Sequence, residues 1–250
     1  MQWQMLLRGL AAALLVACGP VGASGLQVAP IGLRFTPASP AQGLWLTNTG
    51  DRDLRAQVRV FHWTQAGGSD ELASTRMLVA SPPMLNLAPG ARQLVRVIRT
   101  GAQAGTGSGE DAFRVLVDEL PQARPAPQDS GLQYILRYSI PVFVDGANQP
   151  GDAAAPAALH WTFAREDGQV VLAVRNDGLR HAQISDACLL PSSGQPIVVS
   201  PGLLGYVLPG MTVRWPLEHP ADTAGPGAKL TARINGTPVD QAFAVGDLPR

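Results

Sequence analysis

Short segments of alternating apolar and polar residues, each closed by a turn, run through the chain from Leu26 onward. Glycine and proline are plentiful, at 27 and 22 residues, and turn sequences such as Asn48-Thr49-Gly50-Asp51 and Ala88-Pro89-Gly90 separate the segments. A period of two residues is typical of strands, and no helical period is sustained beyond the N-terminal apolar run. The sequence therefore predicts an all-β fold.

The segments fall into two blocks. The first, from Leu26 to about Val144, predicts around seven short antiparallel strands in an immunoglobulin-like sandwich. Residues 145–157, DGANQPGDAAAPA, are small residues and prolines and predict a linker. Alternation resumes over residues 158–250, which predict a second, smaller β-sandwich. Within it, Asn235-Gly236 predicts a hairpin turn.

Residues 1–23 predict a secretory signal peptide. Arg8 precedes an apolar run from Leu10 to Ala17, and small residues follow near a cleavage site at Ala23. The run is too short to span a bilayer. The sequence Leu15-Val16-Ala17-Cys18 also resembles a lipobox, so a lipid anchor at Cys18 is the alternative to a protein released after cleavage. We favour release, because a second cleavage-like site follows.

Charge and motifs argue against several function classes. The formal net charge is 0 and only 15% of residues are charged, which gives no electrostatic footprint for nucleic acid or an anionic membrane. The chain has no G-x-S-x-G, no phosphate-binding glycine loop and no H-E-x-x-H. None of the histidines stands at metal-ligand spacing: His62, His160, His181 and His219. We therefore expect no enzyme, metal, cofactor or small-molecule substrate.

Neither of two other reactive features predicts catalysis. Adjacent Asp118 and Glu119 would point to opposite faces of a strand, so they are unsuited to act as a pair. Cys188 would be the only cysteine left after loss of Cys18, and we expect it to be a small buried side chain.

The stretch GLQYILRYSIPVFV, residues 131–144, predicts an unusually long strand. It would extend to roughly 45 Å, whereas strands usually have about five or six residues. Its even positions are all apolar or aromatic: Leu132, Tyr134, Leu136, Tyr138, Ile140, Val142 and Val144. Such a face on an edge strand would favour aggregation, so the stretch is either a central core strand or an edge that receives a partner. Pro141 lacks an N–H and favours an edge or a change of sheet at that point.

Three segments together resemble the periplasmic pilus chaperones of the chaperone-usher pathway. They are LWLTNTGDRDLRAQVRVFHWTQ, LVASPPMLNLAPGARQLVRVIR, and FRVLVDELP followed by GLQYILRYSIPVFV. They cover about 120 residues in the family's order, and VRNDG and VLPG add weaker support from the second block. The motifs NTGD, W-T-Q and R-Y-S-I-P-V are most similar to the archaic branch, whose subunits resemble spore coat protein U.

The resemblance implies two immunoglobulin-like domains in a boomerang arrangement and a periplasmic location. It implies a chaperone that binds pilus subunits and delivers them to an outer-membrane usher. A subunit lacks one strand of its sandwich, and the chaperone lends a strand to fill the groove, which is a known mode of strand addition. The resemblance places the donated side chains at Leu132, Tyr134 and Leu136, with Tyr138 as an extension.

Members of this family commonly hold the subunit's terminal carboxylate with an arginine and a lysine. The corresponding positions here are Gly32 and Pro141, neither of which can bind a carboxylate through its side chain. Arg34 and Arg137 are the nearby candidates, because a guanidinium can grip a carboxylate through two hydrogen bonds. The alternative is that each is a solvated arginine on a strand face. Arg96 also matches a family position, where a structural role is at least as well supported.

The resemblance also implies one cis peptide bond in Ser81-Pro82-Pro83, with an ordinary trans corner as the alternative. A rival function is an extracytoplasmic two-domain adhesion or carbohydrate-binding module. It would use exposed tryptophans such as Trp45, Trp63 or Trp161 as stacking platforms. An exported hydrolase would need clustered carboxylates, which we do not find in the sequence.

Overall fold

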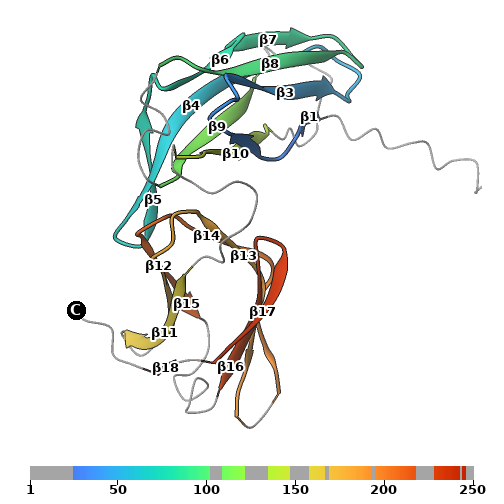
Figure 1. The fold of residues 1–250 in the computed structure, drawn as a ribbon. Helices are drawn as coiled ribbons and strands as arrows, with labels where there is room; N and C mark the ends of the chain where they lie inside the picture. The colour runs from blue at the N-terminus through green and yellow to red at the C-terminus, as the bar shows by residue number, and fades with distance from the viewer. Residues whose placement is uncertain are drawn as a thin grey trace, which may run out of the picture.

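The computed structural model describes residues 25–101, 109–121, 135–146, 158–166, 169–192, 195–217, 228–242 and 244–245. These residues form strands and turns with no helix, so they contain no helix that could cross a membrane. The strands build two lobes that meet at an angle (Figure 1). The expected signal peptide, with Cys18, and the expected linker beyond Gly146 lie outside the described residues.

The first lobe is a sandwich of two sheets. One sheet has the order β1-β3-β8-β6, and the other has the order β2-β10-β9-β4-β5, with β7 also paired to β4. The strands are β1 (Leu26–Ala29), β2 (Leu33–Phe35), β3 (Ala41–Asn48), β4 (Leu54–Ala66), β5 (Ser69–Ser74), β6 (Leu78–Ser81), β7 (Met84–Leu87), β8 (Arg92–Arg99), β9 (Asp111–Leu120) and β10 (Arg137–Val144). Apolar side chains from both sheets fill the space between them, including Phe35, Leu44, Leu46, Val95 and Phe113, each 0% exposed.

The prediction that all strands of this lobe are antiparallel is wrong in one place. The segment LQVAPIGLRF forms two strands in different sheets, and the Ala29–Pro30 peptide bond between them is cis. β1 pairs antiparallel with β3, whereas β2 pairs parallel with β10. The chain crosses from one sheet to the other at this point without reversing its direction. β2 therefore runs parallel to the end of β10.

The second lobe is also a sandwich. Its sheets have the orders β15-β12-β11-β18 and β14-β13-β16-β17. The strands are β11 (Leu159–Glu166), β12 (Gln169–Asn176), β13 (Ala182–Leu190), β14 (Ile197–Val207), β15 (Thr212–Leu217), β16 (Lys229–Ile234), β17 (Thr237–Ala242) and β18 (Ala244–Val245). The predicted turn at Asn235-Gly236 is confirmed: it joins β16 to β17, with φ of 48° and 81°. Leu172, Ile184 and Leu230 lie in a core separate from that of the first lobe.

One asparagine network recurs at a corner of each sandwich. Asn48 ends β3 and Asn176 ends β12, and both are buried. Each side-chain amide donates to two carbonyl groups and accepts from a glycine N–H, at 2.7, 2.9 and 2.9 Å in both sandwiches. The partners are Arg52, Leu87 and Gly50 for Asn48, and Arg180, Val207 and Gly178 for Asn176.

A glycine turn completes each corner. Gly90 and Gly210 donate their N–H groups to the carbonyl groups of Asn48 and Asn176, with φ of 71° and 73°, a region that glycine adopts without steric cost. The pairs NTG with APG and NDG with LPG therefore mark the same corner in both sandwiches.

We expect Asn48→Ala to destabilise the first sandwich by about 2–4 kcal/mol, because the buried Leu87 carbonyl loses its side-chain donor. Urea unfolding followed by tryptophan fluorescence measures the change. Asn86→Ala, at an exposed position of β7, is the matched control and should stay within about 0.5 kcal/mol. Equal effects of the two variants would contradict the role of this corner.

Candidate functional site

Strand β10 is paired on both sides over only part of its length. It pairs with β9 from Arg137 to Val144, but with β2 only from Val142 to Val144. No described strand lies along the other side of Arg137–Ile140, which we call the open edge. Pro141 stands where the strand changes from edge to centre. β10 begins at Arg137, so Ile135 and Leu136, which belong to the stretch predicted as one long strand, lie outside it. β10 itself is an edge for half of its length.

The even-numbered side chains become less buried from Ile140 toward Leu136. Ile140 is buried, and Tyr138 is half-buried against the same core, where its hydroxyl donates to the carbonyl of Leu26. Leu136 is half-buried beside Gly25 at the mouth of the core, and its carbonyl accepts from the Glu119 N–H at 2.9 Å. Tyr138 therefore belongs partly to the core of the first sandwich. Leu132 and Tyr134 lie outside the described residues.

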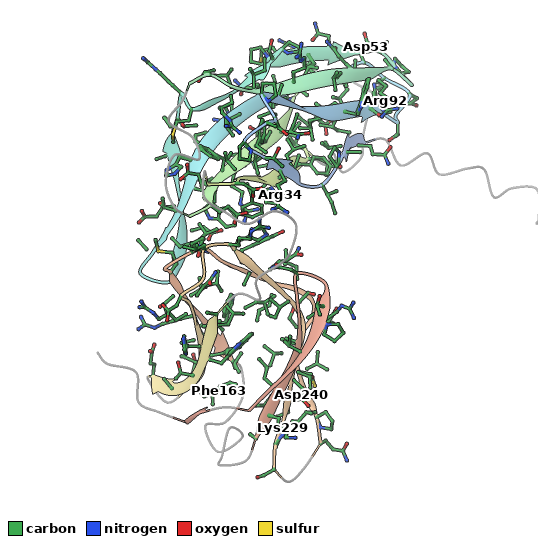
Figure 2. The ribbon with its side chains drawn as sticks, in the orientation of Figure 1. Arg34, Asp53, Arg92, Phe163, Lys229 and Asp240 are labelled. Atoms are coloured by element: carbon green, nitrogen blue, oxygen red, sulfur yellow. The ribbon has the colours of Figure 1, made fainter. Side chains whose placement is uncertain are left out.

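The outward face of the sheet that contains β10 lies toward the second lobe, and both arginines expected to bind a carboxylate stand on it. Arg34, which is labelled in Figure 2, already donates to Asp145, from Nε at 3.0 and 3.2 Å and from a terminal nitrogen at 3.0 Å. Arg137 pairs with Asp118, which also accepts from Arg59 at 2.7 Å. Each expected anchor is therefore already paired with a carboxylate of its own chain, and Arg137 shares its carboxylate with Arg59.

Arg59 and Arg137 together lower the pKa of Asp118. Burial alone would raise the pKa of Asp118, but the hydrogen bonds and charges of Arg59 and Arg137 outweigh burial and hold the pKa below its usual 3.8. The ion pairs therefore stabilise the fold above the unfolded pKa, near 3.8, and this contribution is lost as the pH falls through the lower folded pKa.

We expect Asp118→Asn to lower the urea midpoint of the first sandwich at about pH 7, where Asp118 is ionised. At a pH of about 2–3 the difference from the unchanged protein should shrink, because the native carboxyl then becomes protonated. The measurement is a pair of urea titrations. A difference that is constant over this range would contradict the ion-pair explanation.

Gly32 and Pro141, the two positions that cannot bind a carboxylate through their side chains, lie side by side. A Cβ on Gly32 would lie 3.9 Å from the Pro141 ring. Directly across the sheet from Pro141 stands Arg114 on β9. Sequence reasoning missed Arg114, because its proximity to Pro141 depends on the register of β9 against β10, and a single arginine in an alternating strand gives no local signal.

Arg114 is largely buried beside a single carboxylate among the described residues. Its side chain is 13% exposed, stacks at 3.6 Å from the centroid of Trp63, and has Asp70 at 3.6 Å. Burial lowers the pKa of Arg114, although Asp70 and Tyr206 oppose the shift. Burial also raises the pKa of Tyr206 above 10.0, against the opposing charge of Arg114.

The remaining expected site residues are placed as follows. The Ser81–Pro82 peptide bond is cis. Arg96 is exposed on β8, opposite Gly43 and Ser81. Cys188 is half-buried. In the described part of the chain, no three His, Cys, Asp or Glu side chains are placed to hold a metal ion.

The tryptophans do not form a common platform. Trp63 is 1% exposed, between the lobes, and Trp161 is 6% exposed, in the second core. Trp45 is 37% exposed on the other face of the first sandwich, where Arg92 lies 4.1 Å from its ring centroid. This arrangement counts against the carbohydrate-binding alternative.

Comparison with known proteins agrees with the geometry. Residues 25–148 match the family model of the PapD N-terminal domain, described as a pili and flagellar-assembly chaperone. A search of curated proteins gives no match.

Among solved structures, the chain is similar to a chain of the CsuC-CsuE chaperone-tip adhesion subunit pre-assembly complex, from archaic Csu pili of Acinetobacter baumannii. The identity is 25% and the TM-score 0.67, over 90% of this chain and 100% of that one. The CupB2 chaperone of Pseudomonas aeruginosa has the same fold, at 17% identity and a TM-score of 0.60, over 88% of this chain and 100% of that one. The chain belongs to the family of pili and flagellar-assembly chaperones, and it is a pilus-assembly chaperone with two immunoglobulin-like sandwiches.

Proposed function

We propose that this chaperone acts in the periplasm and binds pilus subunits by donor-strand complementation through β10 and the residues before it. The observation that carries the proposal is the open edge, Arg137–Ile140, which continues a strand that is central at its other end. Unpaired main-chain groups on that edge can receive a strand of the subunit. Leu132, Tyr134 and Leu136 would enter the subunit's groove, and Tyr138 would close the chaperone's own core behind them.

Apolar burial is large enough to hold a subunit. A buried side chain of this size contributes about 1.5–3 kcal/mol, so three donated side chains contribute roughly 4.5–9 kcal/mol before ordering costs. Tyr138, if it also contacts the subunit, would raise the total. Main-chain hydrogen bonds along the open edge would add to this stabilisation.

Arg114 is the side chain that we propose for the subunit's terminal carboxylate. Arg34 and Arg137 would have to release Asp145 and Asp118 before binding it. Among the described residues, Arg114 has one carboxylate partner, Asp70 at 3.6 Å, and it stacks on Trp63 beside Pro141. An incoming carboxylate would therefore compensate a charge that burial disfavours.

The cycle that we propose needs no catalysis and no cofactor. The chaperone would keep the subunit from polymerising and deliver it to an outer-membrane usher, where a segment of a neighbouring subunit replaces the lent strand. The folding free energy of the subunit would drive this exchange.

The test is a pull-down of the tagged protein from the periplasm of its own host, with mass spectrometry of the material that accompanies it. We expect a small β-rich subunit at about one-to-one stoichiometry. Recovery of carbohydrate alone, or of nothing, from abundant folded protein would overturn the proposal.

A further inference from the structure

Gln65, near the end of β4, reaches out of the first sandwich and binds the second. The side chain is 5% exposed. Its Nε2 donates to the carbonyl of Tyr206 at 2.8 Å and to Asp70 Oδ1 at 2.9 Å. Its Oε1 accepts from the N–H of Leu208 at 2.9 Å. One amide group therefore binds main-chain groups of the other sandwich through both its nitrogen and its oxygen.

The two main-chain groups are those that a neighbouring strand would use. In a parallel pair, one residue bonds to the carbonyl before its partner and to the N–H after it. The carbonyl of Tyr206 and the N–H of Leu208 flank Val207, the last residue of β14, in this way. The side-chain amide of Gln65 thus takes the place of the main-chain N–H and C=O of one residue in an added parallel strand.

Apolar and aromatic residues surround these hydrogen bonds, of which the one to Leu208 is buried and the one to Tyr206 is partly buried. Trp63, Ala112, Phe143 and Leu208 form a buried cluster between the sandwiches, with Tyr206 and Met211 packed against it. His181 stacks on Phe143 with ring centroids 3.5 Å apart and is hydrogen-bonded to Glu110 at 2.7 Å. Hydrogen bonds in such a site are stronger than in water, and unpaired groups there are correspondingly costly.

We propose that Gln65 is the positioning residue that fixes the angle between the two sandwiches. Without its amide, the buried Leu208 N–H and the partly buried Tyr206 carbonyl lose their partners, and water replaces them fully only if the interface opens. Because Gln65 also holds Asp70, which faces Arg114, the same residue links the domain angle to the proposed carboxylate site.

The domain angle can be measured without any ligand. Spin labels at Asn86→Cys in the first sandwich and Asp240→Cys in the second, in a Cys188→Ala background, report the distance between the sandwiches by double electron–electron resonance. Both positions are exposed. We expect a narrow distribution with Gln65 and one about twofold wider in Gln65→Met, which keeps the size but loses all three hydrogen bonds. An unchanged distribution in Gln65→Met would overturn the proposal.

Gln65→Glu separates hydrogen bonding from packing. An ionised Glu cannot donate to the Tyr206 carbonyl and would repel Asp70, so the distribution should be wide at about pH 7.5. Burial favours the neutral acid, which both donates and accepts, so the narrow distribution should return at about pH 5. Asp70, Arg114, Tyr206, Glu110 and His181 also face this interface, so the protein with Gln65 is titrated in parallel. A Gln65→Glu distribution that does not change with pH would contradict the hydrogen-bonding role.

The effect of Gln65 on subunit binding can be tested only if the proposed function holds. Gln65→Met should bind the subunit recovered in the pull-down about tenfold more weakly. If the protein with Gln65 captures no subunit, the proposed function fails. The distance measurement still tests whether Gln65 fixes the angle between the sandwiches. If Gln65→Met widens the distribution but captures normally, the link between angle and capture is wrong.

Discussion

Leu136→Glu should abolish subunit capture while the chaperone remains folded. Leu136 is half-buried at the mouth of the core, in line with the side chains that we propose to enter the subunit. The substitution removes about 1.5–3 kcal/mol of apolar burial and adds the cost of placing a carboxylate in an apolar groove. Together these effects predict a loss in affinity of at least about a hundredfold, measured by titration of purified chaperone with refolding subunit.

Two further variants make this result specific. Leu136→Gln removes the apolar contact without adding charge, and it should weaken capture by a smaller factor than Leu136→Glu does. Ile135→Glu places the same charge one residue away, on the side chain that is 55% exposed and alternates to the opposite face. Its capture should be nearly unchanged. Equal losses from Ile135→Glu and Leu136→Glu would mean that charge near this edge, and not the apolar row, determines binding.

Arg114→Met should weaken capture by about ten- to a hundredfold, because the subunit's carboxylate would lose its cation. Arg92→Met is the matched control: Arg92 also lies over a tryptophan ring, at 4.1 Å from Trp45, but in the other sheet. It should leave capture unchanged.

A subunit with an amidated C-terminus completes the double-mutant cycle. It should bind the unchanged chaperone about as weakly as the native subunit binds Arg114→Met, and the two changes together should add little. Fully additive losses would show that Arg114 and the carboxylate do not interact. Arg34→Met and Arg137→Met, tested alongside, would then show whether either arginine releases its aspartate to take this role.

Much of the architecture follows from local pattern. Alternation and turn residues predicted an all-β chain with two sandwiches. Pro141 predicted an edge or a change of sheet, and it stands where β10 changes from edge to centre of one sheet. The division of LQVAPIGLRF between two sheets was not predicted, because a parallel partner that lies more than 100 residues away leaves no trace in the period of a three-residue strand.

The charged residues of the site were harder to predict from the sequence than the strand β10. Arg34 and Arg137 were identified by their nearness to Gly32 and Pro141 along the chain, but each is bound to an aspartate that only the fold brings close. Arg114 and Gln65 reach their positions through strand register and through the contact of the two sandwiches. Contacts between segments that are distant in the sequence determine the positions of both residues. A local sequence pattern cannot predict such contacts.

The most direct test of the lent strand is site-specific photo-crosslinking in the periplasm. A photoreactive amino acid replaces Leu136 in one variant and Asn86, exposed on β7 in the same sandwich, in the other. We expect a covalent adduct with a pilus subunit from position 136 and none from position 86, with the crosslinked subunit residue inside the groove left by its missing strand. Adducts from position 86 alone, or crosslinks from position 136 only to the subunit's outer surface, would contradict donor-strand complementation by this chaperone.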